Sequence, residues 1–411
     1  MPHGGNKMMR SPENNKVQAA LEQIRNIVEQ KLFPLEPEFL KAGGCFKVIS
    51  HELYEIRKHV KNVGLWAPFF PKEWGGMGLS LYEFALVSEQ LGRSPLGHFA
   101  FGCQAPDVGN MELLHQFGSD EQKQAYLSPL ARGDIRSCFA MTEKDNSGAN
   151  PTQLQSYAVK KGDFYEINGH KWFTSGAEGS SFCIAMVLTD REAPIRERAS
   201  MLIVPCEAPG FIIKRNIPVM GHVGSEMMSH AEVEFKQCKV PASNLLGPEG
   251  HGFMLAQERL GPGRIHHCMR WIGLAERAFE LMCERSLSRQ IKADQSLGQN
   301  PLIQSWIGEC KAEIEASRLM VLQAAQVIES RGKDEAKPYI SMIKFKCAQM
   351  LQEVLDKAIQ VHGAMGVSDD TVLAYLYREE RASRIYDGPD EVHKISLAKH
   401  VLRNFKEAKG S

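Results

Sequence analysis

The sequence predicts an α+β protein in which a β domain lies between two helical domains. Apolar residues recur at helical intervals up to about residue 137, and they do so again from residue 251 onward. Between these regions lie short β-like runs separated by glycine, asparagine and proline. This order predicts an N-terminal helical domain over residues 1–137, a middle β domain over 138–250 and a C-terminal helical domain over 251–411.

Two N-terminal segments carry apolar side chains on one helical face. The segment "NNKVQAALEQIRNIVEQKL" has five of them, namely Val17, Leu21, Ile24, Ile27 and Val28. The segment "SLYEFALVSEQLGR" follows the glycine-rich break "EWGGMGLS" and shows the same spacing. Both patterns are typical of helices that bury one face.

Three runs in the middle region predict strands. "DFYEINGHKWFTSG" contains Asn168-Gly169, a pair that favours a hairpin turn. "SFCIAMVLTD" is continuously apolar and predicts a buried strand. "HAEVEFKQCKV" alternates apolar with acidic residues, which predicts a strand with one buried face.

Two long C-terminal segments predict helices. "LIQSWIGECKAEIEASRLMVLQAAQVIE" places Ile303, Trp306, Ile307, Cys310 and Ile314 at helical intervals. "YISMIKFKCAQMLQEVLDKAIQVHG" shows the same period and stops at Gly363, a residue suited to a helix C-cap.

Composition excludes several classes of function. The 411 residues include 49 basic and 49 acidic ones, and this balance gives no reason to expect a nucleic-acid partner. Ten cysteines occur without a CxxC pair or a Cys/His cluster of metal-ligand spacing, so we expect free thiols and no metal. No apolar run reaches the ~20 residues that span a bilayer. Neither terminus resembles a secretory or peroxisomal signal, which predicts a soluble cytoplasmic protein.

Two loops could contact a ligand, although each has a plain structural explanation. "CFAMTEKDNSGAN" (138–150) is rich in small hydroxyl and amide residues that could bind a polar cofactor, or that form an exposed turn. "QVHGAMG" (360–366) is a helix end followed by small residues. They would let a backbone approach a ligand closely, or they simply cap the helix.

Two further motifs are ambiguous by themselves. "ERLGPGR" (258–264) places glycine and proline ahead of a predicted helix that Arg264 opens, and it could be no more than a helix-breaking linker. His266 and His267 are adjacent and could suggest a metal. Neighbouring side chains on a helix point about 100° apart, however, which disfavours a shared ion.

The segment "YDGPDE" (386–391) reads first as a helix start. Pro389 suits the first helical position, Gly388 can cap, and Asp390 with Glu391 favours the positive end of the helix dipole. The remaining acidic residue, Asp387, is either part of this helix start or the base of an enzyme.

Taken together, these segments resemble the acyl-CoA dehydrogenase family over about residues 16–405. "FAMTE" resembles the family's flavin loop, and "YEINGHKWFTSGA" resembles its "Y-x-x-N-G-x-K-x-W-I-T-N-G" stretch. "RIYDGPDEVH" resembles its "I-Y-E-G-T" segment, whose Glu is the catalytic base. "INGHKW", "RLGPGRIHHCM" and "DGPDEVH" are most similar to the branch of family members 10 and 11.

The resemblance implies a fold, a cofactor and a reaction. The fold has an N-terminal helical domain, a barrel-like middle β domain and a C-terminal four-helix bundle. The cofactor is FAD, the substrate is an acyl-CoA thioester, and the reaction is α,β-dehydrogenation. It also implies an electron-transferring flavoprotein or another electron acceptor as partner, and assembly as a homodimer or homotetramer.

The resemblance also assigns residues. Asp387 takes the position of the base, its N–H would bind the thioester oxygen as enolate charge develops, and Arg264 lies near that thioester. Phe173 would face the flavin ring and Ser175 its N5, while Arg289 would reach the pyrophosphate across a subunit interface. The residues expected to contact FAD are Phe139, Met141, Thr142, Phe173, Ser175, Arg289, Gln360, Gly363 and Ala364.

Three departures from the family pattern bear on function. Asp387 is one methylene shorter than the usual Glu, so its carboxylate lies roughly 1 to 1.5 Å further back. Gly263 stands where some members place their base, which leaves Asp387 as the base. "RQIKA" (289–293) lacks the family's Phe-Gly, which makes a packing contact at the FAD-bridging interface, and "TEKDNSGAN" (142–150) lacks its Pro and Gly-Ser-Asp pattern. Three functions follow: an acyl-CoA dehydrogenase, a nitroalkane-oxidase-like flavoprotein, or a non-catalytic acyl- or lipid-binding protein.

Overall fold

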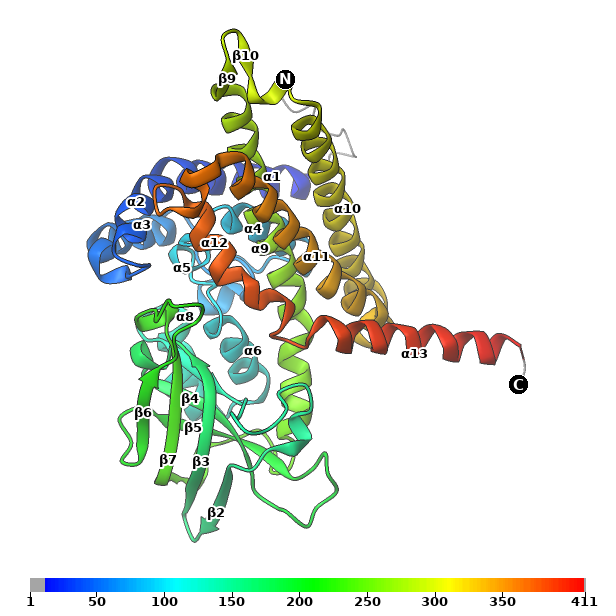
Figure 1. The fold of residues 1–411 in the computed structure, drawn as a ribbon. Helices are drawn as coiled ribbons and strands as arrows, with labels where there is room; N and C mark the ends of the chain where they lie inside the picture. Colours follow the sequence, from blue (N-terminus) through cyan, green and yellow to red (C-terminus); the bar gives the residue numbers. More distant parts are fainter. Residues whose placement is uncertain (1–11, 410–411) are drawn as a thin grey trace.

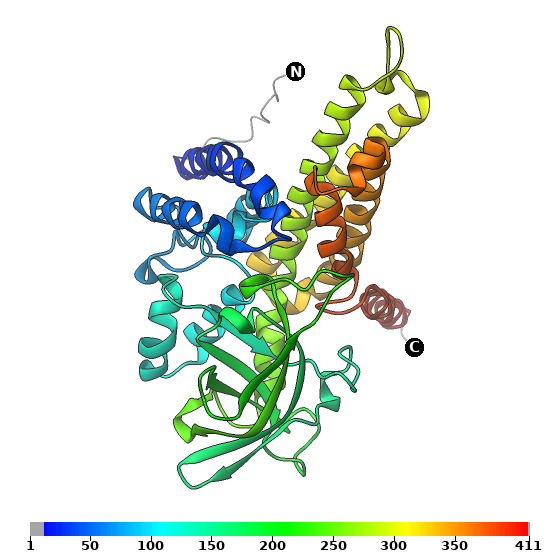
Figure 2. The same cartoon turned by 60° about the vertical axis from the view of Figure 1, so that its left-hand side comes forward.

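The computed structural model describes residues 12–409, apart from the side chains of 12–15 and 260–262, and has three parts (Figure 1). Short helices at the N-terminus and long helices at the C-terminus pack together, and a β-sheet lies beneath them (Figures 1 and 2). The predicted α+β order of helices, strands and helices is confirmed. The N-terminal helices are α1 (Pro12–Ile27), α2 (Glu36–Lys41), α3 (Ser50–Asn62), α4 (Leu81–Gly92), α5 (Gly97–Ala100), α6 (Asp107–Phe117), α7 (Asp120–Gln122) and α8 (Ser128–Ala131).

Apolar spacing determines which face each N-terminal helix buries. In α1 the side chains of Ile24 and Ile27 are buried, as their period predicts. Helix α4 begins at a capping box in which the Ser80 hydroxyl and the Glu83 carboxylate each accept an N–H of the other residue. The predicted helices at "NNKVQAALEQIRNIVEQKL" and "SLYEFALVSEQLGR" are therefore confirmed.

The middle part is one mixed sheet with the strand order β6-β7-β3-β2-β4-β5-β8, and β1 pairs in parallel with β4. Strand β4 is buried almost throughout, and β7 alternates between partly buried and buried residues at its start, as expected for a strand with one buried face. The strands are β1 (Ser137–Ala140), β2 (Tyr157–Lys161), β3 (Phe164–Ser175), β4 (Phe182–Leu188), β5 (Ala199–Pro205), β6 (Phe211–Asn216), β7 (His230–Pro241) and β8 (Leu245–Leu246).

The predicted hairpin turn at Asn168-Gly169 is wrong. These residues lie inside β3, where the pairing with β7 shifts register between Ile167 and Gly169. The Asn168 side chain accepts the N–H of Gln237 on β7 at 2.9 Å. The turn lies earlier, at Gly162 between β2 and β3. Asn-Gly favours a bulge as well as a turn, so the dipeptide alone could not distinguish them.

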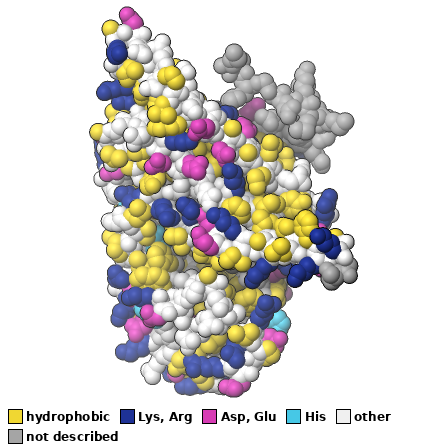
Figure 3. All heavy atoms as spheres, turned by 45° about the vertical axis from the view of Figure 1, so that its right-hand side comes forward, with side chains coloured by type: hydrophobic (Ala, Val, Ile, Leu, Met, Phe, Trp, Pro, Cys, Tyr) yellow, Lys and Arg dark blue, Asp and Glu magenta, His cyan; other side chains and the backbone are white. Residues whose placement is uncertain are grey.

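The C-terminal part is built from long helices. Helices α9, α10 and α11 pack side by side, while α13 leaves the body and projects from it (Figures 1 and 2). Five apolar side chains of α13 are exposed, and Figure 3 shows apolar side chains on this side of the molecule. The elements are α9 (Gly252–Ser288), β9 (Gln290–Lys292), β10 (Gln295–Ser296), α10 (Pro301–Arg331), α11 (Lys333–His362), α12 (Val372–Glu380) and α13 (Asp390–Ala408).

The prediction that Arg264 opens a helix is wrong. Helix α9 begins at Gly252 and runs through residues 261–263, so Arg264 lies in its interior. Packing of α9 against α4, α10 and α11 outweighs the low helix propensity of glycine and proline. The predicted cap at Gly363 is confirmed, because α11 ends at His362 and Gly363 has a φ of 65°. Pro389 precedes α13 rather than opening it.

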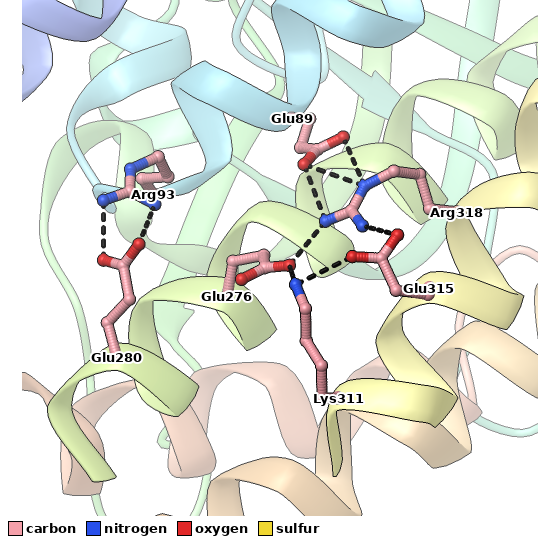
Figure 4. Close-up of polar contacts among 7 residues, drawn as sticks. All are labelled: Glu89, Arg93, Glu276, Glu280, Lys311, Glu315 and Arg318. Carbon is pink, nitrogen blue, oxygen red and sulfur yellow. Dashed lines mark hydrogen bonds and ion pairs between the residues drawn. The ribbon is translucent and has the colours of Figure 1, made fainter. Parts of the chain in front are cut away.

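A network of charged side chains joins the N-terminal helices to the C-terminal ones (Figure 4). Arg318 of α10 bonds Glu89 of α4 and Glu276 of α9, at 2.9 and 2.6 Å. Beside it, Arg93 pairs with Glu280 at 2.7 Å. Glu89 and Glu276 are mostly removed from water, so their charges depend on this arginine.

Replacing Arg318 with lysine is expected to lower the free energy of unfolding by about 1–2 kcal/mol. A lysine keeps the charge but lacks the planar fork that reaches two carboxylates at once. Denaturant unfolding measures this loss. Lys337→Arg, at an exposed pair with Asp334, is the control and should change little. An unchanged midpoint for Arg318→Lys would contradict the expectation.

Candidate active site

The turn between α12 and α13 places Asp387 in an unusual backbone conformation. Its φ is +54°, in the left-handed region that aspartate tolerates better than most residues. Gly388 follows with a φ of 98°, and a Cβ there would lie 2.8 Å from the Nε2 atom of His393. Only glycine therefore fits at position 388, and the pair Asp387-Gly388 sets the direction of the turn.

Three helices hold this turn by its carbonyl groups. The Asp387 carbonyl lies 3.2 Å from the Nε donor of Arg264 and 3.1 Å from Nε2 of His393. The Lys344 ammonium, buried in α11, donates to the carbonyl of Ser383 at 2.6 Å. The structure thus brings Arg264 and Asp387 together. Among the described residues, the Asp387 N–H donates to no protein acceptor.

The Asp387 carboxylate lies among basic side chains. Burial raises its pKa, but the nearby groups His267, Arg264, Arg259 and Lys344 outweigh burial and hold the pKa below its usual value. The closest is His267, whose Nε2 atom is 3.5 Å from Oδ2. The carboxylate is therefore ionised, whereas burial alone would have raised its pKa.

Behind His267 lies a buried polar and aromatic group that sequence reasoning missed. The imidazole stacks on Trp271 with ring centroids 6.1 Å apart, and it lies 5.4 Å from the ring of Tyr386. The Trp271 indole N–H donates to Glu380 at 3.0 Å, and Arg270 pairs with the same carboxylate. The only signal in the sequence is the run "RIHHCMRW", whose helical spacing puts residues 264, 267 and 271 on one face.

The two adjacent histidines face different surroundings. His266 packs edge-on against Phe84, with centroids 4.5 Å apart, and burial lowers its pKa to about 3. His267 faces Asp387 instead. Within residues 12–409, no group of three or more His, Cys, Asp or Glu side chains is placed to hold a metal ion.

Arg259 is a second residue that sequence reasoning missed. Its guanidinium lies 4.2 Å from the centre of the Phe139 ring and contributes to the low pKa of Asp387. Its side chain crosses α6 at Gly109, where an added Cβ would lie 2.7 Å from Nε. That Nε is buried without a hydrogen-bond partner among the described residues. Arg259 therefore packs on β1 and α6, and its charge acts on Asp387.

The loop after β1 is held by a buried ion pair. Lys171, fully buried on β3, contacts Glu143 and the carbonyl of Met141, each at 3.0 Å. Glu143 also accepts the backbone N–H groups of Gln155 and Ser156. Burial raises the pKa of Glu143, but the Lys171 charge and these bonds lower it below its usual value. One carboxylate thus fixes both ends of this loop.

The structure brings the predicted flavin residues of β1 and β3 together. The Trp172 N–H donates to the carbonyl of Thr142 at 2.8 Å. Phe173 has a φ of 57° and leaves 43% of its surface exposed. The Ser175 hydroxyl bonds His230 at 2.7 Å. Phe139, Met141, Thr142, Phe173 and Ser175 therefore lie in adjacent segments, with an exposed aromatic ring among hydroxyl groups.

A cavity of about 220 Å³ lies beyond the end of β3 rather than at Asp387. It extends from Gly176, the residue after Ser175, to the first residue of β1 and to the segment before β7. Its lining residues are Arg136, Ser137, Gly176, Gly179, Ser180, Glu226 and Met227.

The remaining predicted FAD residues lie elsewhere. Arg289 is exposed at the end of α9, beside the β9–β10 hairpin. Gln360, Gly363 and Ala364 are exposed at the end of α11, where His362 lies near Arg285 of α9. Both groups occupy the end of the helices opposite to the start of α13 (Figure 1). Within one chain they do not meet the residues around Asp387.

Comparisons with known proteins agree with this arrangement. Family models of acyl-CoA dehydrogenases match in order: the N-terminal domain at 14–134, the middle domain at 138–238 and the C-terminal domain at 250–402. Probable acyl-CoA dehydrogenase FadE2 of Mycobacterium tuberculosis is 42% identical over 355 residues, which is 86% of each protein. The chain belongs to the acyl-CoA dehydrogenase family.

Other members of the acyl-CoA dehydrogenase family match nearly the whole chain. Acyl-CoA dehydrogenase family member 11 of mouse is 39% identical over 412 residues, covering 98% of this chain and 52% of that protein. The chain thus spans about half the length of this curated relative. A solved Mycobacterium abscessus structure, described as a candidate acyl-CoA dehydrogenase, superposes with a TM-score of 0.90 at 37% identity and covers 97% of this chain and 100% of its own.

The resemblance drawn from motifs is therefore confirmed at the level of the family. The described helices include none that is both long and apolar enough to cross a membrane.

Proposed function

We propose that this protein is an FAD-dependent acyl-CoA dehydrogenase in which Asp387 is the base. The observation that carries the proposal is the ionised Asp387 carboxylate, held in a defined turn, with the Arg259 guanidinium near both this carboxylate and Phe139 of β1. An ionised, well-positioned carboxylate can accept the α-proton of a thioester. The unpaired N–H of the same residue can bind the thioester oxygen.

The residues near β1 and β3 fit a flavin. A planar ring system needs an apolar surface and a few hydrogen-bonding groups, which the exposed Phe173 ring and the Thr142 and Ser175 hydroxyls provide. Phe139 and Met141 add apolar, partly buried side chains on the β1 side. FAD, when bound there, supplies the two-electron acceptor for the substrate hydride.

The substrate of this proposal is an acyl-CoA of long or modified chain. Asp387 accepts the proton from the α-carbon, and Arg264 keeps the backbone of that residue in place through its carbonyl. The electrons must then pass to an electron-transferring flavoprotein or another acceptor.

We also propose assembly as a homodimer or homotetramer. Arg289, Gln360, Gly363 and Ala364 are exposed far from Asp387, so they would contact the FAD of a second copy. Sedimentation of the purified protein gives the assembly state. A purely monomeric enzyme with full activity would contradict this role for Arg289.

One preparation tests the function. The visible spectrum of the purified protein shows whether flavin is bound, and anaerobic addition of acyl-CoAs of several lengths tests reduction. Bleaching of the flavin by an acyl-CoA supports dehydrogenation. A protein that takes up no FAD would overturn the proposal and favour the non-catalytic, acyl- or lipid-binding function.

A nitroalkane-oxidase-like activity is the second candidate. The basic side chains around Asp387 hold its pKa low, and a weak base suits a more acidic carbon such as that of a nitroalkane. Bleaching by nitroalkanes but by no acyl-CoA would favour this function.

The pH dependence of kcat/KM follows from the low pKa of Asp387. In the free protein its pKa lies below the usual value, so it stays ionised at every pH above that range. We therefore expect kcat/KM to stay level from about pH 8 to about pH 5 and to fall only in stronger acid. Stopped-flow flavin reduction at several pH values measures it, with unfolding followed in parallel. An acid limb near neutrality would contradict this assignment.

A further inference from the structure

His267 is the side chain placed to control the Asp387 carboxylate. Its Nε2 atom lies 3.5 Å from Oδ2. The ring can turn little, because it stacks on Trp271 and meets the ring of Tyr386 on another side. Trp271 is itself fixed by its bond to Glu380. The position of His267 is therefore imposed by the protein interior.

The other charged groups around Asp387 bind elsewhere. On α9, Arg264 contacts the Asp387 carbonyl and Arg259 contacts the carbonyl of Pro106. Lys344 of α11 contacts the carbonyls of Ser383 and Gly388, and His393 of α13 contacts the Asp387 carbonyl. Tyr386 bonds Arg270 and Trp271. Within the described part of the chain, only His267 is within ion-pair distance of a carboxylate oxygen of Asp387.

Building on the proposed dehydrogenation, we propose that His267 is a positioning residue for Asp387. Its neutral imidazole directs an Nε2–H at Oδ2, which leaves Oδ1 to accept the substrate proton. As the α C–H bond breaks, an O–H bond forms at Oδ1 and the α-carbon keeps the electron pair. That pair would become the new C=C bond as the β-hydride departs, and FAD, when bound, would supply the acceptor for that hydride.

The burial of His267 and the chemistry of imidazole support a neutral N–H donor at this position. Burial lowers the pKa of His267 to about 4, although the Asp387 charge opposes this, so the ring is neutral at physiological pH. A neutral imidazole can donate from one nitrogen only, and the nitrogen nearest Oδ2 is Nε2.

The short side chain of Asp387 explains why a contact from His267 to Oδ2 would matter for catalysis. An aspartate carboxylate reaches less far than the glutamate usual in the family, so its orientation must be held more closely for a productive approach. Misplacement of a reacting group by about 1 Å can cost about 10²-fold in rate. A fixed donor on Oδ2 limits rotation of the carboxylate.

Two variants of His267 separate positioning from packing. His267→Gln retains an N–H donor, whereas His267→Leu removes it. We expect His267→Leu to lower kcat by about 10- to 100-fold with KM changed by less than about twofold. The isotope effect of an α-deuterated acyl-CoA on flavin reduction should rise. His267→Gln should recover most of the rate, and His251→Leu, at the exposed start of α9, is the control.

A second measurement needs no turnover. The pKa of the Asp387 carboxyl, followed by NMR with ¹³C-labelled aspartate and assigned with Asp387→Asn, should rise in His267→Leu, because the N–H donor beside Oδ2 is lost. It should stay near the wild-type value in His267→Gln. This readout distinguishes a lost contact from a general loosening of the fold.

The results can contradict the positioning role of His267 or the proposed function separately. Equal rates in both variants, or equal losses with an unchanged Asp387 pKa, would overturn the positioning role. If the wild-type protein reduces no flavin with any acyl-CoA, the proposed function fails. The pKa measurement then decides separately whether His267 acts on Asp387.

Discussion

Replacing Asp387 with asparagine is expected to abolish flavin reduction by acyl-CoA, with a loss of about 10²- to 10⁴-fold or more. Asparagine tolerates the left-handed φ of 54° at this position as well as aspartate does, so the turn should survive. It cannot accept a proton from a carbon acid. Anaerobic stopped-flow reduction measures the rate, and the flavin spectrum measures cofactor content.

The control for this variant is Glu391→Gln, which removes an exposed carboxylate from the first turn of α13. It should leave the rate unchanged. Asp387→Glu is informative as well, because the longer side chain gains reach but favours a positive φ less than aspartate. Normal reduction in Asp387→Asn with full flavin content would rule out Asp387 as the base.

Replacing Lys171 with methionine is expected to lower the free energy of unfolding by about 3–5 kcal/mol. The exchange leaves the nearly buried Glu143 carboxylate without its cation. That carboxylate holds both ends of the loop from Met141 to Ser156, so flavin binding should weaken too. Denaturant unfolding gives the energy, and equilibrium dialysis with FAD gives the affinity.

Lys161→Met is the matched control for this prediction. Lys161 pairs with Glu166 on neighbouring strands of the same sheet, but half of its side chain is exposed to water. Its loss should cost less than about 1 kcal/mol. Similar losses in the two variants would show that burial does not strengthen the Lys171–Glu143 pair.

Periodicity and motif order were enough to predict the order of helices and strands and the family. They also identified Asp387 and Arg264, which the structure brings together although they are far apart in sequence. Predictions from short sequence patterns were wrong where the same residues are compatible with two local structures. Asn168-Gly169 suits a bulge as well as a turn, and the glycines of "RLGPGR" are held in α9 by its neighbours.

The contacts that tie the site together could not be read from single segments. Glu143 and Lys171 are 28 residues apart, and nothing in either segment indicates their pairing. Arg259 and His267 lie within a motif that looked like a linker and a metal pair. Their roles depend on which side of α9 faces Phe139 and Asp387, and only the fold determines that.

Helix α9 carries four residues with separate contacts. Arg259 contacts Phe139 of β1 and Arg264 contacts the Asp387 carbonyl, while His267 contacts the Asp387 carboxylate and Trp271 contacts Glu380. Deleting one residue between Arg259 and Arg264 would rotate the later side chains by about 100° relative to Arg259 and shift them by about 1.5 Å. A substitution in this part of α9 alters one contact, whereas an insertion or deletion would disrupt the contacts of Arg264, His267 and Trp271 together. Homologous chains should therefore keep a constant length between these positions, even where the residues differ.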